Sequence, residues 1–357
     1  MKQVRVLLIA PTLDIVGGQA VQADRLLRGM LREPSVKMGF LPINPRAPGI
    51  LSRLQRIKYV RTAVTFCVFF TRLAASVPRY DVLHIFTAAY YSYFLWTVPS
   101  ILIARLFGKK TIVNYRDGQC EDHLRNWRTA LPTLRLADEI VAPSGFLVDV
   151  FKRFGLRARS IFNIIDLDQF AYRKRQPLRP VFMTNRGLEP LYNVGCILRG
   201  FQLIQRRRPE ATLTVAHDGP CRKDLEALTR ELDLRNVSFI GSVSQKDAPK
   251  LYDAADIYLT TPNIDNMPVS LLECFASGVP AISTRVGGVP YILDDERTGL
   301  LIPVNDHVAL AEAALRLLDQ PDLAGRITFN ARAGCDQYRW EVVRDQWIDL
   351  YRQLNDR

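Results

Sequence analysis

The stretch Asp265-Asn266-Met267-Pro268-Val269-Ser270-Leu271-Leu272-Glu273 places two carboxylates eight residues apart across a predicted loop-to-helix junction. Pro268 favours the first turn of a helix, and apolar residues recur at helical spacing over residues 269–276. The first N–H groups of such a helix have no partner within it, and the helix dipole favours an anion there. The sequence therefore predicts phosphate binding by the backbone near Val269, Ser270 and Leu271.

Each carboxylate of this stretch has a predicted role. Asp265 precedes the helix and can accept hydrogen bonds from sugar hydroxyls. Glu273 lies about two turns further on and can accept a bidentate pair from a ribose diol. Phosphate, ribose and sugar occur together in a nucleotide sugar, which is the ligand that this stretch predicts.

Two glycine-containing segments follow, Gly278-Val279-Pro280 and Gly287-Gly288-Val289-Pro290. With them, the stretch resembles the E-x7-E motif of the retaining glycosyltransferases of family 4, which have the GT-B fold. Asp265 makes it a D-x7-E variant, which keeps the charge and shortens the reach. The resemblance implies an α/β protein with two Rossmann-like, doubly wound domains facing across a cleft and a C-terminal helix that crosses back to the first domain.

The pattern of strands and helices predicts the same division. Short β-branched runs alternate with helical stretches in both halves, which is typical of parallel sheets. We predict a first domain over residues 1–167, a polar and Pro-bearing linker over 168–180, a second domain over 181–335 and an amphipathic helix within 336–357. In this family, the first domain binds the acceptor and the second binds the nucleotide sugar.

Three further positions are predicted to face the donor phosphates. Gly17 and Gly18 follow the first strand and let backbone amides approach a diphosphate. Arg186 follows the first strand of the second domain and offers a forked, permanently charged donor to the β-phosphate. The family usually has a lysine a few residues later, and Tyr192 takes that place here without its charge.

Other strand-end loops carry weaker signals. Gly219, in His217-Asp218-Gly219-Pro220, resembles a family turn beneath the nucleotide base, and a plain turn explains it equally well. Asp117 is the predicted acceptor-positioning carboxylate, and Arg116 before it suits an anionic acceptor. His84 is predicted to end a strand, where a structural role is favoured over a catalytic one.

The net charge of +12 is uneven. Residues 1–170 hold 24 Lys and Arg against 12 Asp and Glu, whereas residues 171–357 hold 24 of each. No acid lies between Glu33 and Asp81, where eight basic residues occur. An anionic membrane surface is the predicted partner, and a solvated helix face is the alternative. The chain shows no aromatic-basic recognition motif, so nucleic acid is not predicted to bind.

The sequence favours a cytoplasmic protein that is peripheral at the inner face of the membrane. The six cysteines have no C-x-x-C spacing and suggest a reduced compartment, and the N-terminal residues predict a strand rather than a signal peptide. Residues 82–104 lack charged side chains, but His84, Pro99 and a following strand favour a strand, a loop and a helix over a membrane span.

The family resemblance implies transfer of a sugar from a UDP- or GDP-linked donor to a polysaccharide or lipid-linked oligosaccharide, without a covalent intermediate. We expect neither a metal nor another cofactor, because no D-x-D motif is present and Arg186 with helix amides can neutralise the phosphates. Two alternatives stay open. One is a sugar-nucleotide epimerase, and the other is a catalytically silent scaffold, because Tyr192 and Tyr291 replace usual Lys and Glu residues.

Overall fold

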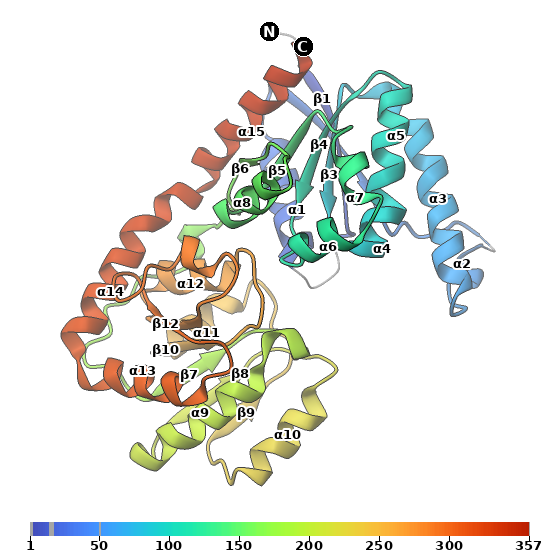
Figure 1. Cartoon of the computed structure of the whole chain (residues 1–357). Coiled ribbons are helices and arrows are strands. Elements are labelled where there is room, and N and C mark those ends of the chain that lie inside the picture. The colour runs from blue at the N-terminus through green and yellow to red at the C-terminus, as the bar shows by residue number, and fades with distance from the viewer. Residues whose placement is uncertain (1–2, 14–17, 50, 357) are drawn as a thin grey trace. The chain divides into compact units, whose positions relative to one another are not determined.

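The computed structural model describes residues 3–13, 18–49 and 51–356, and it divides into two compact units (Figure 1). Unit 1 comprises Met1–Ile164 together with Trp340–Arg357, and unit 2 comprises Ile165–Arg339. The boundary after the first domain therefore lies three residues before the predicted one, and the terminal segment joins unit 1 at Trp340 rather than at residue 336.

Unit 1 is built on a six-stranded sheet whose strands pair in parallel in the order β2-β1-β3-β4-β5-β6. Its strands are β1 (Val4–Ala10), β2 (Val36–Pro42), β3 (Val82–Thr87), β4 (Lys110–Tyr115), β5 (Glu139–Ala142) and β6 (Arg159–Ser160). The chain does not predict β2 clearly, because Gly39 interrupts its apolar pattern. A side chain at Gly39 would collide with the ring of Tyr80, so the glycine is needed for packing.

Helices cover both faces of this sheet. They are α1 (Gly18–Met30), α2 (Leu51–Leu54), α3 (Val60–Ser76), α4 (Tyr90–Ser92), α5 (Val98–Leu106), α6 (Cys120–Asn126), α7 (Ala130–Leu134), α8 (Gly145–Arg153) and α15 (Trp340–Asn355), with a 3-10 turn η1 (Val77–Arg79) and a π-helical turn η2 (Tyr93–Thr97). Leu7 and Ile9 of β1 pack on one side and Val6 and Leu8 on the other. Burial on both faces explains the continuous apolar runs of these strands.

Helix α15 returns from unit 2 and completes unit 1. Its residues Val343, Trp347 and Tyr351 are buried in one apolar cluster with Val6 and Leu8 of β1. Its apolar side chains recur every three or four residues, and this spacing identifies the helix face that packs on the sheet.

The apolar spacing of residues 57–64 predicts one helix through the basic segment, and the structure differs from this prediction. Arg53 and Arg61 do not share one helix, because α2 ends at Leu54 and α3 begins only at Val60. Tyr59 between them has a φ of 71°, in the left-handed region that interrupts a helix. The cations of this segment therefore lie on two helices and the turn between them rather than along one helix. They are Arg53, Arg56, Lys58 and Arg61.

Among the described residues, one helical segment, Val60–Arg79, is long and apolar enough to cross a membrane, with a mean hydropathy of 1.4 and 22% of its scored window buried. Core helices of soluble proteins meet the same criteria of length and composition. The segment 82–104 forms β3, α4, η2 and the start of α5, as predicted.

Unit 2 holds a second six-stranded parallel sheet, in the order β12-β11-β10-β7-β8-β9. Its strands are β7 (Val181–Thr184), β8 (Thr212–Val215), β9 (Val237–Phe239), β10 (Ile257–Thr260), β11 (Ala281–Thr284) and β12 (Leu300–Ile302). Its helices are α9 (Val194–Arg207), α10 (Arg222–Glu231), α11 (Ala248–Ala254), α12 (Val269–Ser277), α13 (His307–Asp319) and α14 (Pro321–Ala333), with 3-10 turns η3 (Leu167–Gln169), η4 (Pro190–Tyr192), η5 (Val289–Tyr291) and η6 (Gly334–Tyr338).

The segment predicted as a linker packs into unit 2. The Arg175 side chain is 1% exposed and donates to the carbonyl oxygens of Ala255, Ser277 and Tyr252 at 2.9, 2.6 and 2.7 Å. Asp256 is also 1% exposed and pairs with Arg173 and Arg179 at 3.0 and 2.9 Å. Polar composition suggested a free linker, but these arginines bond to carbonyl groups at the ends of two helices.

Candidate functional site

The strand order of unit 2 marks the place for a ligand. From β7 the chain runs outward through β8 and β9, and it then returns to the other side of β7 as β10. Loops after β7 and β10 therefore part in opposite directions, which opens a crevice at the carboxyl ends of these strands. Arg186 follows β7 and Asp265 follows β10, so the sheet brings these two predicted residues together.

Arg186 and Asp265 form a largely buried ion pair. Arg186 Nη2 lies 2.5 Å from Asp265 Oδ2, and both side chains are 12% exposed. Burial lowers the pKa of Arg186, but the Asp265 carboxylate and neighbouring tyrosines raise it to a higher final value. Burial also raises the pKa of Asp265, and Arg186 offsets part of that rise. The guanidinium therefore stays charged at the crevice.

Two further contacts orient the Arg186 guanidinium. Its Cζ lies 4.2 Å from the centre of the Tyr192 ring, and Nη1 donates to Ser270 Oγ at 3.4 Å. Tyr192 thus stacks on the arginine instead of supplying the second cation of the family pattern. Arg186 Nε is buried and has no hydrogen-bond partner among the described residues, so the guanidinium retains a donor for a ligand.

The start of α12 supplies backbone donors. Pro268 precedes the helix with a φ of −65°, and no side chain caps this end. The sequence predicts a free N–H at Leu271, but in the structure this group donates to the Pro268 carbonyl at 3.1 Å. The N–H groups of Val269 and Ser270, in the first turn of α12, have no preceding helical carbonyl to which they can donate. This set is smaller than predicted.

Glu273 ends a chain of hydrogen bonds that the sequence did not reveal. Tyr258 donates to Asn185 Oδ1 at 2.9 Å, Asn185 donates to Tyr252 Oη at 2.8 Å, and Tyr252 donates to Glu273 Oε2 at 2.7 Å. Both tyrosines are fully buried, and burial raises the pKa of each. Their hydroxyls remain protonated donors, which holds the Glu273 carboxylate in one orientation.

The missed members of this chain had a weak signal in the sequence. Tyr252 lies in α11 and Tyr258 in the apolar run of β10, and buried tyrosine hydroxyls usually find a partner. Asn185 directly follows β7, beside Arg186. Position at a strand end could have identified Asn185, whereas its two tyrosine partners depend on packing between elements distant in sequence.

The Gly-Gly loop after β11 fixes the backbone around Asp265. A side chain at Gly287 would collide with the Asp265 carbonyl oxygen, and one at Gly288 with that of Asn266. Gly288 also donates its N–H to the Asp265 carbonyl at 2.9 Å. Gly287 has a φ of 51°, which a residue with a side chain rarely adopts. Both glycines therefore support the Asp265 loop.

Gly219 has a comparable structural role. A side chain there would lie 2.5 Å from the Leu188 carbonyl oxygen, so the loops after β7 and β8 can approach only because of this glycine. Leu188 N–H donates to the Asp218 carbonyl at 3.1 Å, and Cys221 N–H donates to that of Leu188 at 2.9 Å. Gly219 therefore holds the Arg186 loop, whereas its predicted contact with a base stays a prediction.

In unit 1, only one of the two predicted phosphate-binding glycines can be placed. Gly17 lies outside the described residues. Gly18 is the exposed first residue of α1, and a Cβ built on it would meet no atom within 4 Å. This open position leaves space for a ligand next to the backbone.

Asp117 braces two loops of unit 1. Its Oδ2 accepts the Ala89 N–H at 3.0 Å, and its Oδ1 accepts the Gln119 N–H at 2.9 Å. The carboxylate thus ties the loop after β3 to the loop after β4. Both oxygens have backbone partners, so the predicted acceptor-positioning role requires a second, shared hydrogen bond.

His84 has a structural role. It lies within β3 rather than at its end, is fully buried, and bonds through Nδ1 to Tyr351 Oη at 2.8 Å and through Nε2 to the Asn114 amide at 3.0 Å. Burial, with a smaller effect of Arg116, lowers its pKa to about 3. The imidazole is therefore neutral at pH 7.

Arg116 bonds to asparagine side chains, whereas Arg186 pairs with a carboxylate. It donates to the side-chain oxygens of Asn163 and Asn114 and lies over the Phe86 ring, with Cζ 4.8 Å from the ring centre. Burial lowers its pKa to about 9. No carboxylate pairs with it within 4.0 Å in the described part of unit 1, so its charge is available to an anionic group.

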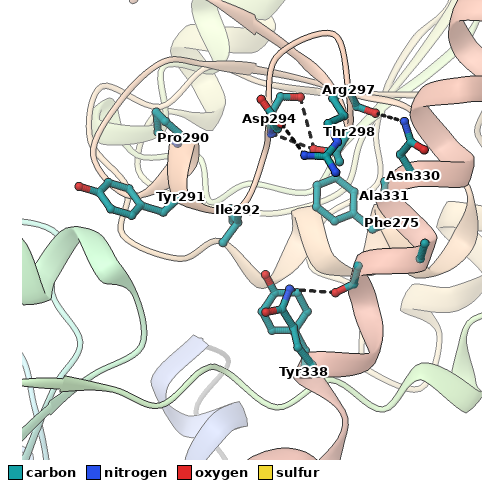
Figure 2. A pocket seen from close by; sticks show the side chains of 13 residues that line it. Phe275, Pro290, Tyr291, Ile292, Asp294, Arg297, Thr298, Asn330, Ala331 and Tyr338 are labelled. Atoms are coloured by element: carbon teal, nitrogen blue, oxygen red, sulfur yellow. Dashed lines mark hydrogen bonds and ion pairs between the residues drawn. The ribbon is translucent and has the colours of Figure 1, made fainter.

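A cavity of about 430 Å³ on unit 2 lies away from these residues. Its lining includes Phe275, Tyr291, Arg297, Asn330 and Tyr338, and none of the predicted site residues. Figure 2 shows Asn330 donating to the Arg297 backbone, at 3.1 Å, while Tyr291 points away from this group. The buried Arg186–Asp265 pair lies at the strand ends instead, and we place the candidate site there.

No group of three or more His, Cys, Asp or Glu residues arranged to hold a metal ion occurs among the described residues. The cation next to the Asp265 carboxylate is Arg186.

The comparison with protein families matches residues 168–334 to the family described as "Glycosyl transferases group 1". A D-inositol 3-phosphate glycosyltransferase of Saccharomonospora viridis is 28% identical over 214 residues, which cover 55% of this chain and 50% of the relative. The chain spans about half the length, or less, of the curated relatives that it matches first.

Solved structures match over nearly the whole chain. Anabaena Alr3699/HepE in complex with UDP and glucose has a TM-score of 0.76 at 16% identity and covers 98% of this chain and 99% of its own. Sucrose-phosphate synthase of Thermosynechococcus elongatus has a TM-score of 0.79 at 19% identity, with 99% of both chains covered. The predicted GT-B fold is confirmed. The matches together show this fold, and residues 168–334 are similar to the group 1 glycosyl transferases.

Proposed function

We propose that the protein is a retaining glycosyltransferase that moves a sugar from a UDP- or GDP-linked donor to a polysaccharide or lipid-linked oligosaccharide. The observation that carries this proposal is the Arg186–Asp265 pair at the switch point of the unit 2 sheet. An arginine donor and a carboxylate acceptor lie side by side there, as a donor with phosphates next to sugar hydroxyls requires. The UDP complex of the HepE structure supports UDP as the first nucleotide to test.

The chemistry assigned to Arg186 is stabilisation of the leaving group. As the bond between the anomeric carbon and the phosphate oxygen breaks, negative charge grows on the diphosphate, which the guanidinium and the N–H groups of Val269 and Ser270 stabilise. The acceptor oxygen bonds to the anomeric carbon from the same face, and its proton passes to the leaving phosphate. The residues of the chain supply the positive charge that this step needs, so we propose that it proceeds without a metal.

Asp265 and Glu273 have separable roles under this proposal. Asp265 accepts hydrogen bonds from the transferred sugar, so Asp265→Asn is expected to lower turnover more than donor affinity. Steady-state kinetics with a fixed acceptor checks this. An effect on the KM for the donor alone would contradict the role assigned to Asp265.

A panel of nucleotides tests the proposal first. UDP, GDP, ADP and CDP are each titrated with the wild-type protein in thermal-shift experiments, because a ligand that binds the native state raises its apparent stability. We expect one uridine or guanosine diphosphate to stabilise the protein and the others to have little effect. No stabilisation by any nucleotide would favour the catalytically silent scaffold.

The products of the reaction distinguish a sugar-nucleotide epimerase from a glycosyltransferase. With a nucleotide sugar and no acceptor, an epimerase converts the sugar while it stays attached to the nucleotide. A transferase releases the nucleotide and joins the sugar to an added acceptor. Chromatography of the nucleotide products distinguishes these outcomes, and an epimerised nucleotide sugar would contradict our proposal.

We also propose that unit 1 contacts an anionic membrane surface on the cytoplasmic side. Arg53, Arg56, Lys58 and Arg61, here called the basic surface, are all exposed. Between them, Ile57, Tyr59 and Val60 are 51%, 82% and 38% exposed. Cations mixed with exposed apolar side chains favour the interface between lipid headgroups and acyl chains.

Cosedimentation with vesicles tests this surface. Each cation near an anionic surface is worth about 1 kcal/mol, so neutralising the four residues together is expected to weaken binding to phosphatidylserine vesicles by several kcal/mol. A control variant neutralises four exposed cations of unit 2: Arg206, Arg207, Lys223 and Arg230. An equal loss of binding in both variants would show that only the net charge of the protein matters. It would contradict a role for the basic surface in particular.

A further inference from the structure

A second pocket lies in unit 1, in the loops that follow β3 and β4. It has a volume of about 290 Å³ and is lined by six residues, here called the Trp127 pocket: Tyr91, Phe94, Asn126, Trp127, Arg128 and Thr129. These residues come from α4, η2, the end of α6 and the turn before α7. The carboxyl ends of parallel strands are where α/β sheets bind ligands, and none of the six residues belongs to the site in unit 2.

Aromatic rings form the wall of this pocket. Tyr91 is 74% exposed and Phe94 46%. The Tyr91 and Trp127 rings lie 5.2 Å apart at 87°, an edge-to-face arrangement, and Tyr90 supports Trp127 from 5.8 Å. Exposed aromatic side chains grouped around a pocket indicate a binding surface more strongly than scattered ones do.

Polar groups at the pocket lack partners. Thr129 lines the pocket, and its Oγ1 is buried without a hydrogen-bond partner among the described residues. Asn126 uses its amide to donate to Asp122 at 2.7 Å, which leaves its carbonyl oxygen as an acceptor. Buried polar atoms usually find partners, so an unpaired hydroxyl at a pocket indicates a ligand that can bond to it.

The backbone that presents the aromatic wall is unusual. Tyr90 has a φ of 57°, and residues Tyr93–Thr97 form a π-helical turn. Both conformations are costly or rare and are found often at functional sites. The Tyr90 hydroxyl donates to Asp122 at 2.5 Å, and the Tyr93 hydroxyl bonds to Thr133 Oγ1 at 2.6 Å. These bonds hold the segment that carries Tyr91 and Phe94.

We infer that the Trp127 pocket binds a sugar ring of the acceptor. The apolar C–H face of a sugar packs against aromatic rings, and its hydroxyls can bond to Asn126, Arg128 and Thr129 at the edge. A lipid chain would cover the rings but leave the Thr129 hydroxyl without a partner. The inference rests on the proposed function, because it assigns the acceptor of that reaction to a saccharide.

Ligand-observed saturation-transfer NMR tests this without requiring activity. Maltose, cellobiose and chitobiose are the saccharide probes, and geranyl phosphate is the lipid probe. We expect at least one disaccharide to bind the wild-type protein, and Tyr91→Ala or Trp127→Ala to weaken that binding by about tenfold. Thr129→Val, which keeps the side-chain shape and removes the hydroxyl, is expected to weaken it by about fivefold.

Phe329→Ala is the matched control, because Phe329 is an exposed aromatic of unit 2, at 69%. It should leave disaccharide binding unchanged. Binding of no disaccharide, or binding that Tyr91→Ala and Thr129→Val leave intact, overturns the inference, as does geranyl phosphate binding at this pocket in place of sugar. Nucleotide-induced thermal shifts of the same variants are expected to match the wild type, so failure of the donor site and failure of this pocket are told apart.

Discussion

The two units differ in the charged partners of their buried polar side chains. Unit 2 buries opposite charges together: Arg186 with Asp265, and Arg175 with Asp256. Unit 1 buries the Arg116 guanidinium without a carboxylate partner in its described part, and its two buried histidines have neutral partners: His84 bonds to Tyr351 and Asn114, and His123 bonds to Tyr115 at 2.7 Å. Burial lowers the pKa of His84 to about 3 and that of His123 to about 4, so both are uncharged at pH 7.

This difference matches the ligands proposed for the two units. A nucleotide diphosphate is strongly anionic, and fixed charges stabilise it best where water is excluded. A saccharide is neutral, and aromatic rings with a few hydrogen-bonding groups suit it better. The following predictions test whether charge in unit 2 and neutrality in unit 1 matter as this comparison implies.

The largest effect is expected for Asp256→Asn. Its loss leaves the Arg175 side chain, 1% exposed, without a buried countercharge, and breaking such a pair costs about 3–5 kcal/mol of folding free energy. Urea unfolding followed by hydrogen exchange of unit 2 peptides measures it. The control is Asp319→Asn, because the Arg208–Asp319 pair is 38% and 56% exposed and is expected to be worth no more than about 1 kcal/mol. Similar losses in both variants would contradict the importance of the buried pair.

Arg186→Ala is expected to lower turnover by about a hundredfold or more, because one preorganised donor to the leaving phosphate is lost. Arg186→Lys should recover only part, since lysine lacks the forked geometry. Single-turnover rates with saturating donor measure the effect. Arg297→Ala, at the unit 2 cavity, serves as the control and should keep the wild-type rate. A wild-type rate in Arg186→Ala together with a lowered rate in Arg297→Ala would place the donor site at that cavity.

Glu273→Gln is expected to weaken nucleotide binding by about 1.5–3 kcal/mol and leave the fold intact. The fold should persist because the glutamine oxygen can still accept the Tyr252 hydroxyl. Titration calorimetry gives the Kd, with Glu296→Gln as an exposed control in the same unit. An unchanged Kd in Glu273→Gln would remove this residue from the ribose site.

The smallest effect concerns pH and unit 1. The pKa of His84 is lower in the folded state than its ordinary value of 6.5, so the unfolded state binds more protons below pH 6.5. The stabilising contribution is complete above pH 6.5 and is lost as the pH falls toward about 3. Between pH 7 and pH 5 this amounts to about 2 kcal/mol.

Tryptophan fluorescence can follow this loss in unit 1 alone, because Trp96, Trp127, Trp340 and Trp347 are the four tryptophans of the chain and all belong to unit 1. Urea unfolding at pH 7 and pH 5 is compared between the wild type and His84→Asn, and the variant should lose less stability on acidification. An equal loss would assign the pH dependence to other groups.

The sequence predicts the framework of this fold well where patterns are local. Apolar spacing and flanking turns predict a strand over residues 181–184 and helices over residues 194–207 and 248–254, and β7, α9 and α11 have these bounds. Strand β2 is less evident, since Gly39 serves packing against Tyr80 rather than a turn. The break at Tyr59 is also hidden, because no proline or glycine marks it.

The candidate site is also predictable only where its residues are marked by a local pattern, such as the end of a strand. Arg186 and Asp265 could be paired in advance, because both follow neighbouring strands of one sheet. The chain from Tyr258 through Asn185 and Tyr252 to Glu273 could not, since it depends on side chains that meet only after three elements pack. Asp117 was given an acceptor role from its position, whereas its hydrogen bonds to Ala89 and Gln119 are visible only in the fold.

Helix α15 has a consequence for synthesis on the ribosome. Unit 2 is complete once Arg339 has emerged, but the sheet of unit 1 lacks Val343, Trp347 and Tyr351 until α15 follows. At 5–20 residues per second, the residues of unit 2 take on the order of 10–35 s to translate. During that interval Val6, Leu8 and His84 lack the cover that α15 supplies, although α1 already packs on the same face of the sheet. The nascent chain therefore presents an apolar surface to chaperones, and the unit that is begun first is finished last.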